Sequence, residues 1–178
     1  TKISENLFNT SNLDLRINYW NSSIEMIKES PVTGVGAGNW RINFVKQGLR
    51  GLNKSIIDGY TTINRPHNDI LWVFSETGIV GLLGFIGFFV FSLWYALKAA
   101  MAEEPQTQKL FYIFSFVGIL SFVIYGLFEF PLERPEHMVF LILYSAVGIS
   151  GFIKLSEGQK FLVPNQIVLS VFMLSTLF

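Results

Sequence analysis

The chain has 178 residues, of which 51% are hydrophobic and only 15% charged, and its formal net charge is zero. This is more apolar surface than a soluble domain of that length can bury, so the composition excludes an ordinary soluble protein and indicates a membrane protein. Cysteine is absent, which excludes disulfides, zinc-thiolate sites and thiol chemistry.

The chain opens at Thr1 on a polar stretch without a signal-peptide pattern, and we expect it to be a piece of a larger membrane protein. A helix is predicted from Ser11, which begins a capping box, to Ser30, which precedes a proline. Arg16 lies at the edge of its apolar stripe, where it either reaches into a groove or is a solvated flank residue. The stripe recurs at helical spacing and consists of Leu13, Ile17, Trp20, Ile24 and Ile27.

A glycine-rich stretch, residues 33–39, follows this helix. A nucleotide-binding loop would need a preceding strand, so we predict a turn in which Asn39 caps the next helix. On that helix Lys46, Arg50 and Lys54 are spaced one turn apart. The basic row either contacts an anion or lipid headgroups, or forms a solvated face.

His67 is the main candidate for chemistry. Pro66 ends the preceding segment and an apolar run follows, which predicts that His67 lies near the amino terminus of a helix at the membrane surface. The helix dipole there disfavours a positive charge and leaves the neutral imidazole that a general base requires. Free amide groups also favour phosphate, so Arg65 and His67 would flank a diphosphate position. The alternative is that His67 is a cap or a packing residue.

The rest of the chain predicts membrane helices. Residues 77–97 and 110–128 lack ionisable acids and bases and approach the roughly 20 residues that a span requires. A shorter span is expected at about 138–155, and a truncated one at 161–178. We therefore predict an all-α, polytopic helical membrane protein fragment, with a helical extracytoplasmic loop over residues 1–76 and membrane helices over residues 77–178.

Lysines in the short turns set the predicted orientation. Lys98 and Lys109 flank one turn, and Lys154 and Lys160 flank another, so these turns should face the cytoplasm. Residues 1–76 then lie on the outer face, where a reaction needs a preactivated substrate reached through the membrane.

Acidic residues on the outer side suggest further roles. Glu76, at the mouth of the first span, should have a partner such as a cation of the loop. The turn between the second and third spans offers a metal or acid-base cluster, or else a structural turn that anchors helices or contacts an acceptor. Its candidate residues are Glu129, Glu133, Glu136 and His137.

Four short motifs follow one another between residues 16 and 84: Arg16-x3-Trp20, Pro31-x2-Gly34-x-Gly36-x-Gly38-Asn39, His67-Asn68-x2-Leu71, and Glu76-x-Gly78-x2-Gly81-Leu82. In order and spacing they resemble the O-antigen ligase and polymerase superfamily. The later helices fit that family in hydropathy alone. The resemblance implies a multi-pass protein of the bacterial inner (cytoplasmic) membrane, with residues 1–76 on the periplasmic side.

The resemblance also implies a reaction, in which a glycan moves from a polyprenyl diphosphate carrier to an acceptor hydroxyl with inversion and without a metal or cofactor. No Asp-x-Asp metal motif occurs in the chain. His67 would accept the acceptor proton and Arg16 would hold the diphosphate, whose growing charge needs cations. The remaining candidates for substrate contact are the cations Arg65, Lys46 and Arg50, together with Asn68, Glu76 and Trp20.

The acceptor is left open among lipid A core sugar, a growing glycan and a protein hydroxyl, and no nucleic-acid partner is expected. Transport is a second interpretation, since some proteins similar to this family are bicarbonate carriers. Carriers usually place charged groups at the bilayer midplane, and the first two predicted spans lack them. A third interpretation is a noncatalytic subunit of glycan assembly, which would tolerate loss of His67 and Arg16.

Overall fold

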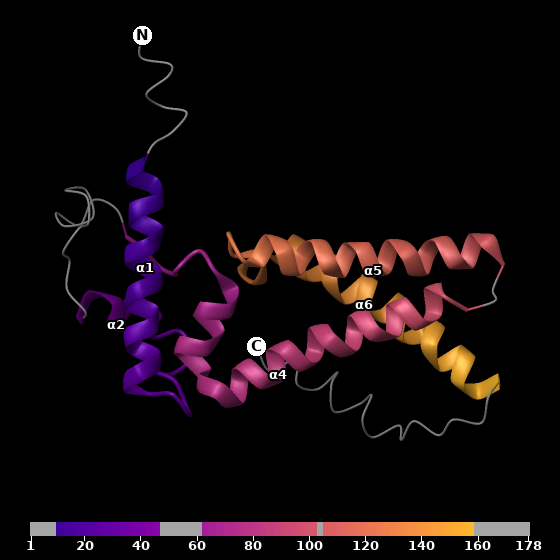
Figure 1. Ribbon diagram of the computed structural model, residues 1–178, viewed down its shortest axis with the longest axis horizontal. Helices are drawn as coiled ribbons and strands as arrows, with labels where there is room; N and C mark the ends of the chain where they lie inside the picture. Colours follow the sequence, from indigo (N-terminus) through magenta and orange to yellow (C-terminus); the bar gives the residue numbers. More distant parts are fainter. Residues whose placement is uncertain (1–9, 47–61, 103–104, 159–178) are drawn as a thin grey trace, which may run out of the picture. The chain divides into compact units, whose positions relative to one another are not determined.

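The structure, a computed structural model, describes residues 10–46, 62–102 and 105–158. All regular elements in these ranges are helical, which confirms the all-α prediction. The predicted helix at 161–178 lies outside the described residues. The elements are α1 (Thr10–Glu29), α2 (Trp40–Lys46), α4 (Asp69–Ala100), α5 (Gln106–Gly126), the short 3-10 helix η1 (Pro131–Glu133) and α6 (Pro135–Gly158) (Figure 1).

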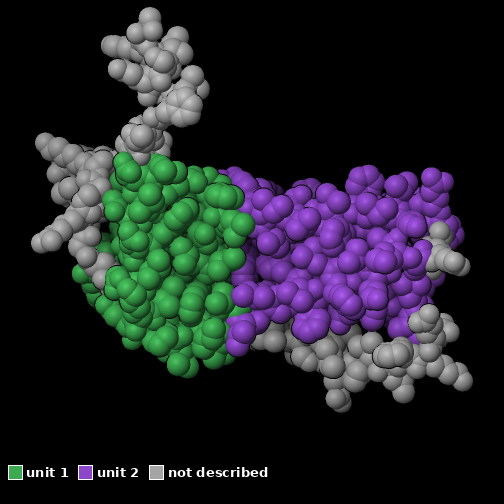
Figure 2. Space-filling view, in the orientation of Figure 1, with its two compact units in different colours: residues 1–82, 126–130 green, residues 83–125, 131–178 purple. Residues whose placement is uncertain are grey.

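The chain divides into two compact units, coloured separately in Figure 2. Unit 1 comprises Thr1–Leu82 and Gly126–Phe130, and unit 2 comprises Leu83–Tyr125 and Pro131–Phe178. Helix α4 contributes residues to both units. The short segment Gly126–Phe130, which follows α5, is thus part of the same unit as α1 and α2.

The core of unit 1 forms between α1 and α2. Tyr19 and Met26 of α1 are buried together with Trp40 and Phe44 of α2. The small side chain of Ser23 leaves room for the indole of Trp40, whose Nε1 donates a 2.8 Å hydrogen bond to the Ser23 hydroxyl. A large aromatic ring is therefore buried with its polar group satisfied.

The apolar stripe expected on α1 is not its buried face. Leu13, Ile17 and Ile24 are 63%, 42% and 39% exposed. The buried face carries Tyr19 and Met26 instead, because these residues meet the aromatic rings of α2. Helix α1 also begins at Thr10, one residue before the expected cap at Ser11, and ends at Glu29, one residue before the predicted end at Ser30.

Helix α4 is broken at Gly78 and is drawn as two helical parts joined by a bend (Figure 1). Gly78 has φ 67° and ψ −166°, a conformation that only glycine adopts readily. In an unbroken helix the Ile79 amide would donate to the carbonyl of Ser75. Here it donates to the carbonyl of Pro31 at 2.9 Å, and the Ser75 carbonyl accepts from Val35 at 2.9 Å.

The loop of residues 31–38, called the glycine loop below, thus occupies the break in α4. The amide of Gly36 adds a third bond, donating to the carbonyl of Glu76 at 2.9 Å. The backbones approach so closely that a Cβ on Gly34 would lie 2.3 Å from the carbonyl carbon of Glu76. A Cβ on Gly78 would lie 2.2 Å from the carbonyl oxygen of Val32. Gly34 and Gly78 therefore allow the two backbones to pack closely.

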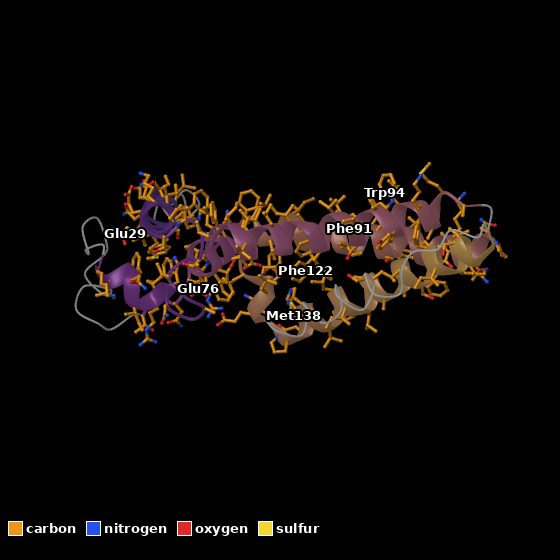
Figure 3. All side chains as sticks on the ribbon, turned by 90° about the horizontal axis from the view of Figure 1, so that it is seen from below. Glu29, Glu76, Phe91, Trp94, Phe122 and Met138 are labelled. Atoms are coloured by element: carbon orange, nitrogen blue, oxygen red, sulfur yellow. The ribbon has the colours of Figure 1, made fainter. Side chains whose placement is uncertain are left out.

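The side chain of Glu76 completes this junction, and Figure 3 shows it beside α2. Its two carboxylate oxygens accept from the amides of Gly38 at 2.9 Å and Trp40 at 2.8 Å. These amides lie at the start of α2, where free N–H groups favour a negative charge. Glu76 thus has the expected partner in the loop, but in the part of the chain that the structure describes this partner is a pair of backbone amides.

Unit 2 is built from the long apolar helices. Among the described residues, α4, α5 and residues Pro135–Ser156 of α6 are long and apolar enough to cross a membrane. Phe89, Ile119 and Leu141 are central to their shared core, which also includes Phe122 and Met138, labelled in Figure 3. Phe91 and Trp94 are about half exposed, as expected of side chains that face lipid. The predicted polytopic membrane fold is confirmed.

The break in α4 yields the first prediction. Gly78→Ala should lower the melting temperature of the detergent-solubilised full-length protein by about 5 °C or more. The strained backbone alone costs about 1–3 kcal/mol, and the methyl group would overlap the Val32 carbonyl. Gly84→Ala is the matched control, because a Cβ at that position of α4 meets no atom within 4 Å. Equal melting temperatures for the two variants would contradict this account of the junction.

Candidate functional site

His67 lies on a tight turn directly before α4, which begins at Asp69. Its φ is 56°, a left-handed conformation that is unusual for a residue other than glycine. Trp20 of α1 holds the turn from one side, with its indole Nε1 donating a 3.0 Å hydrogen bond to the carbonyl of Pro66. A strained turn that is held in this way is typical of functional sites.

Asn68 holds the turn from the other side. Its Oδ1 accepts a 3.0 Å hydrogen bond from the amide of Leu71, which makes Asn68 the cap of α4. Its Nδ2 donates a 3.0 Å bond to the carbonyl of Leu127 in the segment after α5. One side chain therefore ties the turn to a segment far away in the sequence.

The imidazole of His67 lies between two aromatic rings. Tyr19 stacks on it with ring centroids 6.3 Å apart, and Phe130 meets it edge-on at 4.9 Å. Burial among these rings lowers the pKa of His67, and the charges of Arg16 and Arg65 lower it further, against the opposing effect of Glu129. A lowered pKa favours the neutral imidazole, and burial is its largest cause. The effect of the helix terminus on this pKa stays a prediction.

Glu129 connects His67 to Arg16. Its Oε1 accepts a 2.8 Å hydrogen bond from Nη2 of Arg16, and its Oε2 lies 3.5 Å from Nδ1 of His67. The second distance is longer than a well-formed hydrogen bond, so the contact is mainly one of charge. Nη1 of Arg16 also donates a 2.8 Å bond to the carbonyl of Phe128. One carboxylate thus joins both residues that the sequence singled out.

Sequence reasoning missed Glu129 as a partner of His67 and grouped it with the acids of the following turn. The available signal was its setting, because it is the one charged residue in the apolar run 127–130. Glu136 and His137 belong to unit 2, where Nδ1 of His137 lies 3.6 Å from a carboxylate oxygen of Glu136. No group of three or more side chains in the described ranges is arranged to hold a metal ion.

Arg65 adds a second cation to the site. Its guanidinium lies 4.7 Å from the ring centroid of Phe130 and 5.8 Å from that of Trp72. Such contacts with ring faces stabilise a cation that is partly removed from water. Arg16, Arg65 and His67 are thus brought together, with Phe130 touching both His67 and Arg65.

The other predicted contact residues are engaged differently. The polar groups of Trp20, Asn68 and Glu76 bind the protein itself, so their visible role is to position the turn and the glycine loop. Lys46 is exposed at the end of α2 and donates a 3.2 Å hydrogen bond to Asn43. Arg50 and Lys54 lie outside the described residues, so the basic row stays an expectation.

Comparison with known proteins bears on the same region. Residues 4–86 match the family described as O-antigen ligase, and this range contains Arg16, Arg65 and His67. The resemblance to the O-antigen ligase and polymerase superfamily is confirmed. With its three apolar helices, the chain is part of a multi-pass membrane protein.

The chain is also similar to the exopolysaccharide production protein ExoQ of Rhizobium meliloti (strain 1021), with 26% identity over 140 residues. This similarity covers 78% of the chain and 31% of the relative, so the chain spans less than a third of the relative's length. No solved structure matches the chain. Glu129 lies beyond the residues that the superfamily match covers.

The two bonds of Asn68 yield a second prediction. Asn68→Ala should lower the melting temperature, because losing the cap costs about 1 kcal/mol and the bond to Leu127 is lost as well. Asn68→Asp retains a capping oxygen but no longer donates to Leu127, so it should be intermediate between Asn68→Ala and the unchanged protein. Thermal unfolding of the full-length protein in detergent measures this order. An aspartate variant as stable as the unchanged protein would show that the Leu127 bond contributes nothing.

Proposed function

We propose that this chain forms the acceptor-activating part of a membrane glycosyltransferase. The enzyme would move a glycan from a polyprenyl diphosphate carrier to an acceptor hydroxyl, in the manner of an O-antigen ligase or polysaccharide polymerase. The observation that carries this proposal is a half-buried histidine, held at the amino terminus of an apolar helix, that shares Glu129 with Arg16 and Phe130 with Arg65. The superfamily match supports it, and so does the name of the exopolysaccharide relative.

The proposed reaction needs little beyond a base and cations. His67 takes the proton of the acceptor hydroxyl while the acceptor oxygen bonds to the anomeric carbon of the donor sugar. The bond from that carbon to the diphosphate breaks on the opposite face, and the electron pair leaves with the polyprenyl diphosphate. Inversion follows from this geometry. The proton then passes from His67 to water.

Arg16 is assigned to the diphosphate, whose negative charge grows as the bond breaks. Its guanidinium binds Phe128 and Glu129 through two different nitrogens, which orients the group and leaves its other N–H bonds for phosphate oxygens. Arg65 is proposed as a supporting cation. Lys46 and Arg50 are assigned to the same anion only as part of the expected basic row.

The attachment of the site to a membrane helix suits a lipid-linked donor. The turn with His67 leads directly into α4, which continues as a candidate span. We propose that the site lies at the periplasmic face of the bacterial inner membrane, in keeping with the lysine turns on the other side. Donor and acceptor sugars would meet there without ATP or nucleotide sugars. Lipid A core, a growing glycan or a protein hydroxyl would serve as acceptor by the same chemistry.

Replacement of His67 tests the base. His67→Asn should abolish glycan transfer, because an amide side chain cannot accept a proton near neutral pH. Asn is chosen because it tolerates the left-handed backbone at this position. The full-length variant would be expressed in a strain that lacks its own copy, with surface glycan read by immunoblot and membrane levels checked. Loss of glycan with retained lipid-linked precursor is the expected result. Normal glycan would reject the enzymatic proposal and favour transport or noncatalytic assembly.

Replacement of Arg16 tests the diphosphate contact. Arg16→Lys keeps the charge but loses the planar fork that binds phosphate and carboxylate through two nitrogens, so transfer should fall by about tenfold or more. Arg41→Lys is the matched control, since Arg41 is exposed on α2. Both variants would be compared in the same complementation assay. Equal glycan levels in the two strains would remove Arg16 from the binding site.

A further inference from the structure

The mechanism above leaves one charged group of the site without a task, the carboxylate of Glu129. We infer that Glu129 is the positioning residue of this site, which directs one nitrogen of His67 toward the acceptor and holds Arg16 where the diphosphate binds. This inference rests on the proposed function. It adds to the site a residue that lies beyond the superfamily match at residues 4–86.

The contact with Arg16 fixes the direction of the guanidinium. The Phe128 carbonyl and the Glu129 carboxylate, from neighbouring residues, each accept a 2.8 Å hydrogen bond from a different terminal nitrogen. A guanidinium held at two points cannot rotate freely, so less entropy is lost when phosphate binds its remaining N–H groups. Arg16 is about one-third exposed, so those groups lie within reach of a ligand.

The contact with His67 selects the nitrogen that reacts. Nδ1 of His67 is buried and lies 3.5 Å from the Glu129 carboxylate, whereas the side chain as a whole is 30% exposed. A negatively charged oxygen at this distance attracts an N–H and repels a nitrogen lone pair, so Glu129 favours the tautomer with the proton on Nδ1. The other ring nitrogen is then left unprotonated to act as the base. Glu129 acts through His67 and does not touch the acceptor itself.

Glu129 also balances the charges around His67. The groups facing the imidazole are Arg16 and Tyr19 from α1, Arg65 from the turn and Glu129 from the segment after α5. Burial and both arginines lower the pKa of His67, and Glu129 is the group that raises it. Without Glu129 the imidazole would be a weaker base. The imidazolium formed during transfer would then lie beside two positive charges with no negative charge opposing them.

The segment Gly126–Phe130 is anchored well enough to serve this purpose. The Leu127 carbonyl accepts from Asn68, and Phe128 accepts from Arg16. The Phe130 ring contacts both His67 and Arg65. The carboxylate is thus held on either side by contacts with the site that it would position.

The test compares Glu129→Gln, Glu129→Asp and Glu136→Gln in the full-length protein. Glu136 is the matched control because it is an exposed acid in the first turn of α6, in unit 2. Diethyl pyrocarbonate reacts with the neutral form of a histidine and not with its protonated form. The pH dependence of His67 modification, read on its peptide by mass spectrometry, therefore reports the His67 pKa. Glycan transfer is measured on membranes of the deletion strain in which each variant is expressed. These membranes supply the lipid-linked glycan that accumulates without the protein.

In Glu129→Gln the modification midpoint should move to lower pH, because the group that raises the His67 pKa is lost. Transfer should fall about ten- to hundredfold, part of the roughly 10²- to 10⁴-fold that a general base contributes. The neutral base is present above its pKa and lost below it, so the acid limb of transfer should move to lower pH with the midpoint. Glu129→Asp should restore part of the transfer and part of the shift in midpoint. Glu136→Gln should change neither the midpoint nor the transfer.

An unchanged midpoint in Glu129→Gln, or unchanged transfer, would overturn the positioning role. A purely structural role would lower transfer without moving the midpoint, and it would not be relieved by aspartate. If Glu129→Gln fails to reach the membrane, Glu129→Asp serves as the test. Its shorter side chain keeps the charge at a greater distance, so the midpoint should move to lower pH by a smaller amount and transfer should fall less. Retained transfer in His67→Asn would reject the proposed function itself. Retained transfer in Glu129→Gln, with transfer lost in His67→Asn, would reject only the positioning role of Glu129.

Discussion

The hydrogen bonds exchanged between the broken helix α4 and the glycine loop organise unit 1. A helix interrupted at Gly78 frees backbone groups that need partners, and residues 31–36 supply them through three bonds of 2.9 Å. Glu76, from the same turn of α4, binds the amides at the start of α2. The break thereby connects α1, α2 and α4 through the backbone. Only glycine at positions 34 and 78 permits so close an approach.

The candidate site depends on this arrangement because its residues come from three separate parts of the chain. Arg16 and Tyr19 come from α1, His67 from the turn before α4, and Glu129 from the segment after α5. Their joint effect is a charge balance. Burial and the two arginines lower the pKa of His67, and the carboxylate of Glu129 raises it. In the proposed mechanism, arginines that attract a diphosphate would otherwise weaken the base beside them.

Helix α4 links this chemistry to the membrane. The helix begins directly after the turn with His67, where Asn68 caps it. It is long and apolar enough to span a bilayer. Freed backbone groups are costly near lipid, so a broken helix at such a place requires protein around the break. The glycine loop meets that requirement. A rigid site at the end of a membrane helix suits the proposed use of a donor whose carrier lies in the bilayer.

Hydropathy and local pattern determined the all-α membrane fold with three long apolar helices, the turn at His67 and the end of α1 to within one residue. These features depend on neighbouring residues, and the chain carries that information locally. Tertiary structure alone decided which face of α1 is buried, that Glu76 binds backbone amides, and that Glu129 joins Arg16 to His67. Each of these is a contact between distant segments, and the energy of such a contact depends on which groups packing brings together.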